Sequence, residues 1–115
     1  MTSFVFPGQG SQTTGMIKDF YDNFKIVKSI FEEVEDNTRI DLKKIIFNND
    51  NNSLNLTKYT QISIFVASYA IFKTLCSEKG YNENYINVMM GHSLGEYTAL
   101  ACSNKISLKD CSLIL

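Results

Sequence analysis

Cysteine, proline and tryptophan are scarce in this sequence: 115 residues include three cysteines, one proline and no tryptophan. The cysteines, Cys76, Cys102 and Cys111, form no CxxC pair, so neither a disulfide framework nor a thiolate metal site is expected. This cysteine usage indicates the reducing cytoplasm. Charge of one sign is also lacking, since 11 basic and 12 acidic side chains give a net charge of −1. We therefore expect no nucleic-acid partner, because nucleic-acid binding favours a basic protein.

The sequence has no long hydrophobic run. Its most apolar segment, residues 62–75, is too short to span a bilayer and includes serine, threonine and lysine. Residues 1–7 show neither a basic start nor an extended apolar stretch, so no secretory signal and no membrane partner are expected. The length allows one small domain or a piece of a larger one.

Hydrophobic spacing predicts an alternation of strands and helices. Both predicted strands are short apolar runs that end at a glycine-containing loop, and the helices show apolar residues at intervals of three and four. In chain order, we predict a strand at 3–6, a helical pattern over 16–34, a capping box at 38–41 opening a short helix through Ile46, an asparagine-rich surface loop at 48–55, a long buried helix at 60–78 capped by Gly80, a buried strand at 85–90, a helix over 94–101 and a helix start at Ser107.

This order of elements predicts an α/β fold with a partial parallel sheet and flanking helices. The last residues include Cys111, Leu113, Ile114 and Leu115, which are apolar and carry no helix cap. A domain rarely stops inside an apolar helix, because the exposed face needs a packing partner. We expect residues 1–115 to be the N-terminal portion of a single domain that is truncated at its C-terminus.

The chemistry of the sequence is concentrated in residues 91–95, Gly-His-Ser-Leu-Gly, which match G-x-S-x-G between a predicted strand and a predicted helix. Such a turn lifts the hydroxyl of Ser93 out of the sheet, and glycines on either side avoid collisions with neighbouring backbone. The helix that begins at Leu94 presents free N–H groups to an oxyanion formed on a carbonyl that Ser93 attacks. Ser93 is therefore a candidate nucleophile that needs a base.

A structural alternative is that Ser93 and Glu96 form a capping box and only satisfy backbone N–H groups at the helix start. His92 is the one histidine in the chain. It is a poor candidate for the base, because neighbouring side chains leave a strand on opposite faces and His92 should point away from Ser93.

Two strings together resemble the malonyl-CoA:acyl carrier protein transacylases, an acyltransferase family related to the acyltransferase domains of polyketide synthases. They are residues 6–12, Phe-Pro-Gly-Gln-Gly-Ser-Gln, and residues 91–97, Gly-His-Ser-Leu-Gly-Glu-Tyr. Thr60 and Gln61 are also similar to the family, although Ile62 stands where a proline usually follows. The resemblance extends over essentially all 115 residues.

The resemblance implies that Ser93 is the catalytic nucleophile and that the N–H groups of Gln9 and Leu94 form the oxyanion hole and bind substrate, with Gln61 helping to order the site. It implies the first part of an α/β-hydrolase-like core without the family's small ferredoxin-like subdomain. The catalytic histidine and the carboxylate-binding arginine of the family lie beyond Leu115. Arg39, the only arginine, matches no family motif and is read as a solvated residue at a helix start.

The implied function is transfer of malonyl from malonyl-CoA to Ser93 and then to the phosphopantetheine thiol of acyl carrier protein in fatty acid biosynthesis, without metal or cofactor. Lacking a base, this chain alone is expected to be weak or inactive. Three alternatives stay open. The chain is an acyltransferase piece of a polyketide synthase, a non-enzymatic truncated or split remnant that needs a partner chain for the missing C-terminal half, or a serine hydrolase.

Overall fold

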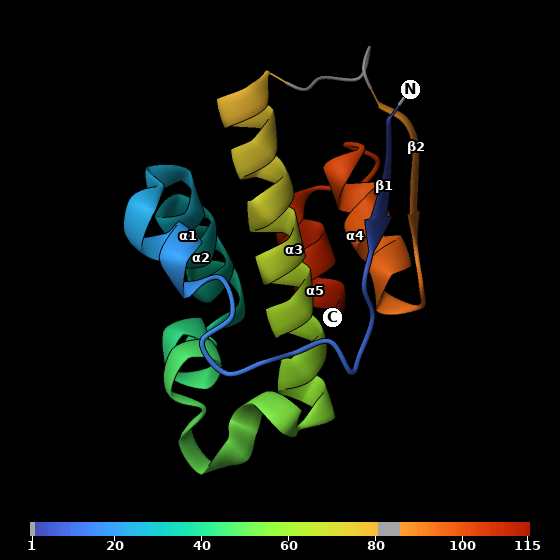
Figure 1. Ribbon diagram of the computed structural model, residues 1–115. Coiled ribbons are helices and arrows are strands. Elements are labelled where there is room, and N and C mark those ends of the chain that lie inside the picture. The colour runs from blue at the N-terminus through green and yellow to red at the C-terminus, as the bar shows by residue number, and fades with distance from the viewer. Residues whose placement is uncertain (1, 81–85) are drawn as a thin grey trace.

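The computed structural model describes residues 2–80 and 86–115, which form a two-stranded parallel sheet and a set of helices packed beside it (Figure 1). The predicted α/β class is confirmed. The elements are β1 (Thr2–Phe6), α1 (Lys18–Asn23), α2 (Lys25–Thr38), the π-helix η1 (Lys44–Asn48), the 3-10 helix η2 (Asp50–Asn55), α3 (Thr57–Lys79), β2 (Ile86–Gly91), α4 (Leu94–Cys102) and α5 (Leu108–Ile114).

The two strands lie side by side in parallel, with Phe6 at the end of β1 opposite Gly91 at the end of β2. Phe4 and Phe6 point toward α3, where both rings contact Phe72 with centroids 5.2 and 6.1 Å apart. The alternate residues of the two strands point to the opposite face of the sheet. Because the carboxyl ends of parallel strands meet at one edge, the loop after β1 and the turn after β2 are brought together.

The outward face of the sheet is apolar and exposed. Val5 is paired with Met90, and these side chains are 69% and 51% exposed, while Val88 is 43% exposed. The prediction that the second strand is buried is therefore wrong for this face, since nothing in the described part of the chain covers it. Tyr85, where that strand was predicted to begin, lies outside the described residues.

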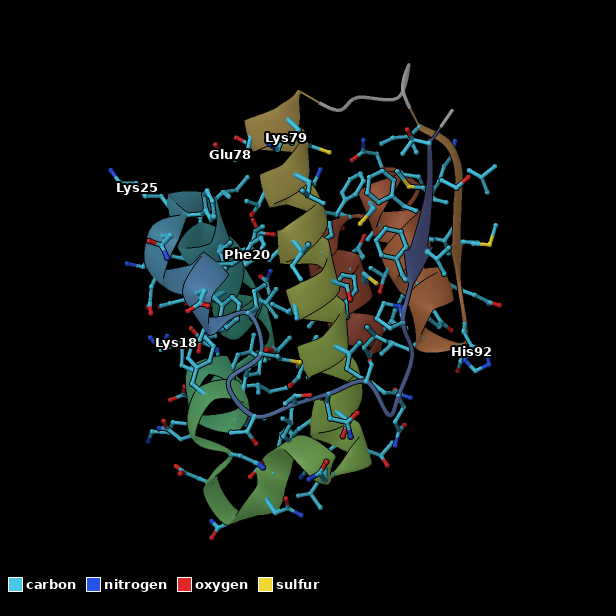
Figure 2. All side chains as sticks on the ribbon, viewed as in Figure 1. Lys18, Phe20, Lys25, Glu78, Lys79 and His92 are labelled. Carbon is cyan, nitrogen blue, oxygen red and sulfur yellow. The ribbon has the colours of Figure 1, made fainter. Side chains whose placement is uncertain are left out.

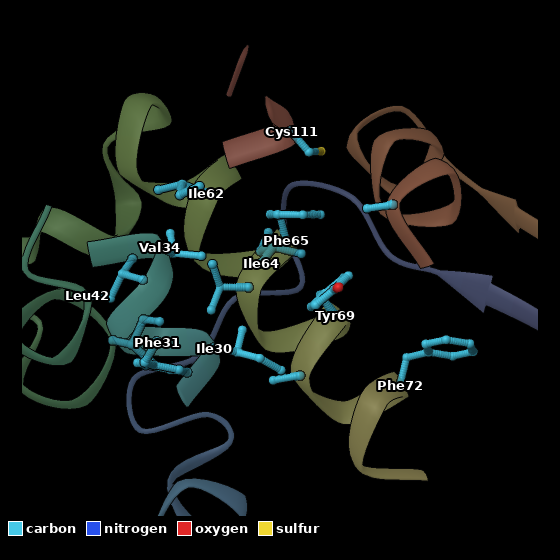
Figure 3. Close-up of a cluster of buried hydrophobic side chains, with 14 of the residues drawn as sticks. Ile30, Phe31, Val34, Leu42, Ile62, Ile64, Phe65, Tyr69, Phe72 and Cys111 are labelled. Carbon is cyan, nitrogen blue, oxygen red and sulfur yellow. The ribbon is translucent and has the colours of Figure 1, made fainter. Parts of the chain in front are cut away.

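The long helix α3 is the centre of the core. It contacts α2, α4 and η2, and nearly half of its residues are buried, including Ile62, Ile64 and Phe65 (Figure 3). Gly80 ends the helix in the left-handed conformation (φ 69°), as the sequence predicted. The helix begins three residues earlier than the predicted Thr60. None of the described helices is long and apolar enough to cross a membrane.

The predicted helical pattern over 16–34 is divided into α1 and α2. Phe24 takes an extended conformation (φ −127°, ψ 118°) between them and interrupts the helix. The break lets Tyr21 from α1 pack edge-on against Phe31 of α2 and Phe47, with centroids 5.1 and 5.2 Å away. Tertiary packing of aromatic rings thus overrides the local periodicity.

The predicted capping box at 38–41 is wrong. Thr38 is the last residue of α2, and its hydroxyl donates to the carbonyl oxygen of Val34 at 2.7 Å. Asp41 caps the next turn instead, accepting from the N–H of Lys44 at 3.2 Å. The asparagine-rich segment predicted as a loop lies largely on the surface but is wound into η2, which buries Leu54. By contrast, Ser107 starts α5 as predicted, accepting from the N–H of Asp110.

Candidate active site

Ser93 lies at the turn between β2 and α4, in a backbone conformation that side chains rarely adopt (φ 56°, ψ −110°). A non-glycine residue with positive φ is strained, and such strain is concentrated at functional positions. The serine is exposed, while Leu94 and Gly95 after it are buried. The structure therefore presents the Ser93 side chain at the tip of a tight turn that becomes buried immediately after it.

Two glycines make this turn possible. A Cβ built on Gly91 would overlap the carbonyl group of Gly95, and a Cβ built on Gly95 would overlap the carbonyl group of Phe6. Neither obstacle is a flexible side chain, so a larger residue would have to displace backbone. The two glycines of G-x-S-x-G thus allow the start of α4 to lie against both strands, as the sequence predicted.

The first N–H groups of α4 are only partly satisfied. Those of Gly95 and Glu96 donate to the carbonyl oxygens of His92 and Ser93, each at 3.0 Å. The Ser93 side chain makes no capping hydrogen bond, so the capping-box alternative is wrong. Within residues 2–80 and 86–115, the N–H of Leu94 has no hydrogen-bond partner. It is left free beside Ser93, at the positive end of the helix dipole.

The loop after β1 lies against this turn. The N–H of His92 donates to the carbonyl oxygen of Phe6 at 3.3 Å, and a Cβ on Gly8 would be 2.6 Å from the carbonyl oxygen of His92. Gln9 follows immediately and is exposed. Its N–H likewise has no partner among the residues that the structure describes. The two predicted oxyanion donors, Gln9 and Leu94, therefore belong to backbone segments in direct contact.

The other residues considered from the sequence are placed differently. His92 projects from the end of β2, exposed, with its Nδ1 beside Gly8, and it makes no hydrogen bond to Ser93 in the described structure (Figure 2). Arg39 is exposed at the end of α2 and lines a small cavity of about 260 Å³ with Tyr59, away from Ser93. Gln61 is half-buried in the first turns of α3.

The cysteines are unsuited to nucleophilic chemistry. Burial raises the pKa of Cys102 to about 12 and that of Cys111 to about 11, and it raises the pKa of the half-buried Cys76 as well. These thiols stay protonated at neutral pH, and only a thiolate is a strong nucleophile. Among residues 2–80 and 86–115, no group of side chains is suited to a metal ion. Ser93 is thus the reactive group that the turn presents.

A groove of about 900 Å³ lies beside the site, between β2 and the facing sides of α3 and α4. Gly91 and Glu96 belong to its lining, together with Lys73 and Lys105, whereas Ser93 and Gln9 do not. No motif in the sequence indicates this groove. It arises from α3 and α4 converging on one strand edge, which no local pattern reveals.

The parallel sheet, its packed helices and the strained serine turn define an α/β protein organised around a strand–serine–helix junction. The chain belongs to the acyl transferase domain family, whose sequence model matches residues 3–115.

Similar proteins include the malonyl CoA-acyl carrier protein transacylase of Bacillus subtilis, which is 38% identical over 94% of this chain and 26% of its own length. The crystal structure of the Clostridium perfringens transacylase superposes with a TM-score of 0.89 at 36% identity, over 97% of this chain and 34% of that one. A malonyl-transacylase in complex with a type II polyketide synthase acyl-carrier protein superposes with a TM-score of 0.88 at 38% identity, over 97% and 35%. The chain spans about a quarter to a third of the length of these relatives.

Proposed function

We propose that this chain provides the nucleophile and the oxyanion hole of a malonyl-CoA:acyl carrier protein transacylase. Ser93 Oγ attacks the thioester carbonyl of malonyl-CoA, the serine proton passes to a base, and the carbon–sulfur bond breaks to release the thiol of CoA. The malonyl ester on Ser93 is then attacked by the phosphopantetheine thiol of acyl carrier protein, which regenerates the serine. Matched relatives carry both substrates in their names.

The observation that carries the proposal is the strained Ser93 turn beside the free N–H of Leu94. Attack on the thioester makes a tetrahedral intermediate with a negatively charged oxygen. We assign the N–H groups of Gln9 and Leu94 to that oxygen, because each lacks a partner among the described residues and their segments touch at Gly8 and His92. Fixed donors of this kind stabilise the transition state more than the substrate.

None of the residues that the structure describes supplies a base within hydrogen-bond reach of Ser93. We therefore propose that the chain acts as the N-terminal portion of an α/β-hydrolase-like acyltransferase domain, with the base and the carboxylate-binding group supplied by further sequence. The chain by itself should transfer malonyl slowly, since the oxyanion hole alone accounts for only part of the catalysis. We place the reaction in fatty acid biosynthesis, in the cytoplasm. The three free cysteines support the cytoplasmic location.

The test is intact-mass spectrometry of the purified chain after incubation with malonyl-CoA. We expect a malonyl increment on the unmodified chain and none on Ser93→Ala. Ser77→Ala, which changes an exposed serine at the other end of the molecule, should acylate normally. An increment that persists in Ser93→Ala would overturn the assignment of Ser93.

The acceptor distinguishes a transacylase from a serine hydrolase. After acylation, holo-acyl carrier protein should remove the malonyl group from Ser93 faster than water does. Loss of the group at the same rate with and without carrier protein would favour the hydrolase. A requirement for the carrier protein of a polyketide synthase, with no transfer to that of fatty acid synthesis, would place the chain in polyketide synthesis.

A second candidate role, docking to a chain that completes the sheet, is favoured by the exposed apolar face of Val5, Val88 and Met90. Co-expression with the remaining part of the Bacillus subtilis relative, of which this chain covers 26%, should then give a stable complex. Met90→Lys should weaken that complex without unfolding this chain, because Met90 is half exposed. Absence of a complex in size-exclusion chromatography would count against this role.

A further inference from the structure

The side chain of Gln12 joins two parts of the molecule that are far apart in sequence. Its Oε1 accepts from the N–H of Gly10 at 2.8 Å, inside the loop that carries Gln9. Its Nε2 donates to Oδ1 of Asn55 at 3.1 Å, at the end of η2. One amide therefore fastens the loop after β1 to a segment 43 residues later.

The far end of this connection is itself held in place. Nδ2 of Asn55 donates to Oδ1 of Asn52 at 2.7 Å. The neighbouring Leu54 is buried, and its carbonyl oxygen accepts from the buried hydroxyl of Thr60 at 2.5 Å. Asn55 is thus attached to the first turn of α3 and to the core, so it provides a fixed point for Gln12.

The near end is held on both sides of Gln9. Before it, the carbonyl oxygen of Gly8 accepts from the hydroxyl of Ser11 at 2.8 Å. After it, the N–H of Gly10 is occupied by Gln12. Gly10 has φ 109° and open space around it, so its own packing does not fix its conformation. The N–H of Gln9 is the group that this arrangement leaves available.

We infer that Gln12 is a positioning residue that fixes the orientation of the Gln9 N–H by binding Gly10 and anchoring it to Asn55. The inference rests on the proposed function, in which Gln9 donates to the oxyanion. A donor aimed in advance stabilises the transition state without reorganisation, whereas a loop that samples several orientations loses part of that effect. The affinity for malonyl-CoA does not depend on the orientation of the Gln9 N–H.

The test compares Gln12→Met and Asn55→Leu with the unmodified chain in single-turnover acylation over a range of malonyl-CoA concentrations. Gln12→Met removes both hydrogen bonds of the Gln12 side chain at similar volume. We expect the maximal acylation rate to fall about threefold to tenfold, the amount expected when the one hydrogen bond from the Gln9 N–H to the oxyanion is lost. The half-saturating concentration and the melting temperature should stay within error. Asn23→Leu, which removes the side-chain bond from Asn23 to the Asp19 carbonyl on α1, is the matched control and should acylate normally.

Two further results separate positioning from a general structural role. The double variant should be no slower than Gln12→Met, because both changes interrupt one connection. Amide hydrogen exchange at Gly10 should accelerate about tenfold or more in Gln12→Met, while exchange in the centre of α3 stays unchanged.

The outcomes for the two proposals are distinct. If Ser93→Ala is acylated as readily as the unmodified chain, the proposed function fails, and exchange at Gly10 still decides whether Gln12 holds the loop. If the unmodified chain is acylated, an unchanged maximal rate in Gln12→Met overturns the inference about Gln12 alone. Unchanged exchange at Gly10 overturns it in either case.

Discussion

The backbone of Gly95, the second residue of α4, lies directly against the carbonyl group of Phe6, the last residue of β1. This contact joins the two halves of the candidate site, since Phe6 precedes the loop of Gln9 and Gly95 follows Ser93. The same Phe6 carbonyl accepts the N–H of His92 at 3.3 Å. One peptide group thus sets the distance between the loop after β1 and the serine turn.

Gly95→Ala is expected to destabilise the protein by about 2 kcal/mol or more, because the new Cβ would overlap backbone that cannot rotate away. In an unobstructed helix the same change would stabilise by about 1 kcal/mol, since alanine favours helix. Urea unfolding monitored by circular dichroism measures the difference. Acylation of Ser93 should also slow.

Gly80→Ala is the matched control for this prediction. Gly80 has positive φ but nothing within 4 Å, so the substitution costs only about 1 kcal/mol of backbone strain. It lies at the end of α3, and acylation should be unaffected. Equal effects of the two substitutions on stability and acylation would show that the contact with Phe6 is unimportant.

Phe72→Ala should weaken the packing of the sheet against α3. Its ring contacts both Phe4 and Phe6, and its side chain is 4% exposed, so truncation leaves a cavity and costs about 3–5 kcal/mol. The neighbouring Ile71 is 37% exposed, and Ile71→Ala should cost about 1 kcal/mol or less. Chemical denaturation compares the two. A Phe72→Ala protein as stable as Ile71→Ala would contradict the packing described here.

Glu35, near the end of α2, makes two contacts, and substitutions of Glu35 and Lys43 should separate their contributions to stability. Its carboxylate accepts from the N–H of Leu42 at 3.0 Å and from Nζ of Lys43 at 2.6 Å, and this bond raises the pKa of Lys43. Glu35→Ala leaves the Leu42 N–H unpaired and should cost about 1–2 kcal/mol. Lys43→Ala removes only an ion pair whose lysine is 44% exposed, and it should cost under about 1 kcal/mol. Thermal unfolding of both variants measures which substitution destabilises the protein more. A larger loss of stability in Lys43→Ala than in Glu35→Ala would refute the prediction.

The buried thiols should make stability fall at high pH. In the unfolded chain a cysteine ionises near its ordinary pKa of 9.0, whereas burial raises the pKa of Cys102 to about 12 and that of Cys111 to about 11. Above pH 9 the unfolded chain loses protons that the folded chain keeps, so the free energy of unfolding decreases as pH rises from 9 toward 12.

Urea unfolding at pH 7, 9 and 10.5 measures this decrease, and Cys102→Ala should reduce its slope. A slope remains from Cys111 and from Tyr69, whose pKa burial raises to about 12. Stability that is constant up to pH 10.5 in the unmodified chain would mean that these side chains are solvated.

Local patterns predicted the elements whose structure depends on nearby residues. The structure confirms three such predictions: the strand that stops before Pro7, the helix cap at Gly80 and the start of α5 at Ser107. Each depends on interactions within a few positions of the chain. The failures lie where distant contacts decide. Phe24 breaks a good helical pattern so that aromatic rings can pack, and Thr38 ends α2 although its sequence predicted the start of the next helix.

The candidate site could be predicted from the residues alone: a serine between two glycines at a strand-to-helix junction, with a glycine-rich loop some eighty residues before it. Those residue types allow the tight turn and the close backbone approach. Tertiary contacts were needed to show that the capping alternative is wrong and that Gln12 ties its loop to Asn55. They also show that the N–H groups of Gln9 and Leu94 lie in touching segments and have no partner within residues 2–80 and 86–115. Hydrogen-bond partners far apart in sequence are set by how parallel strands and packed helices align, and no local pattern records that alignment.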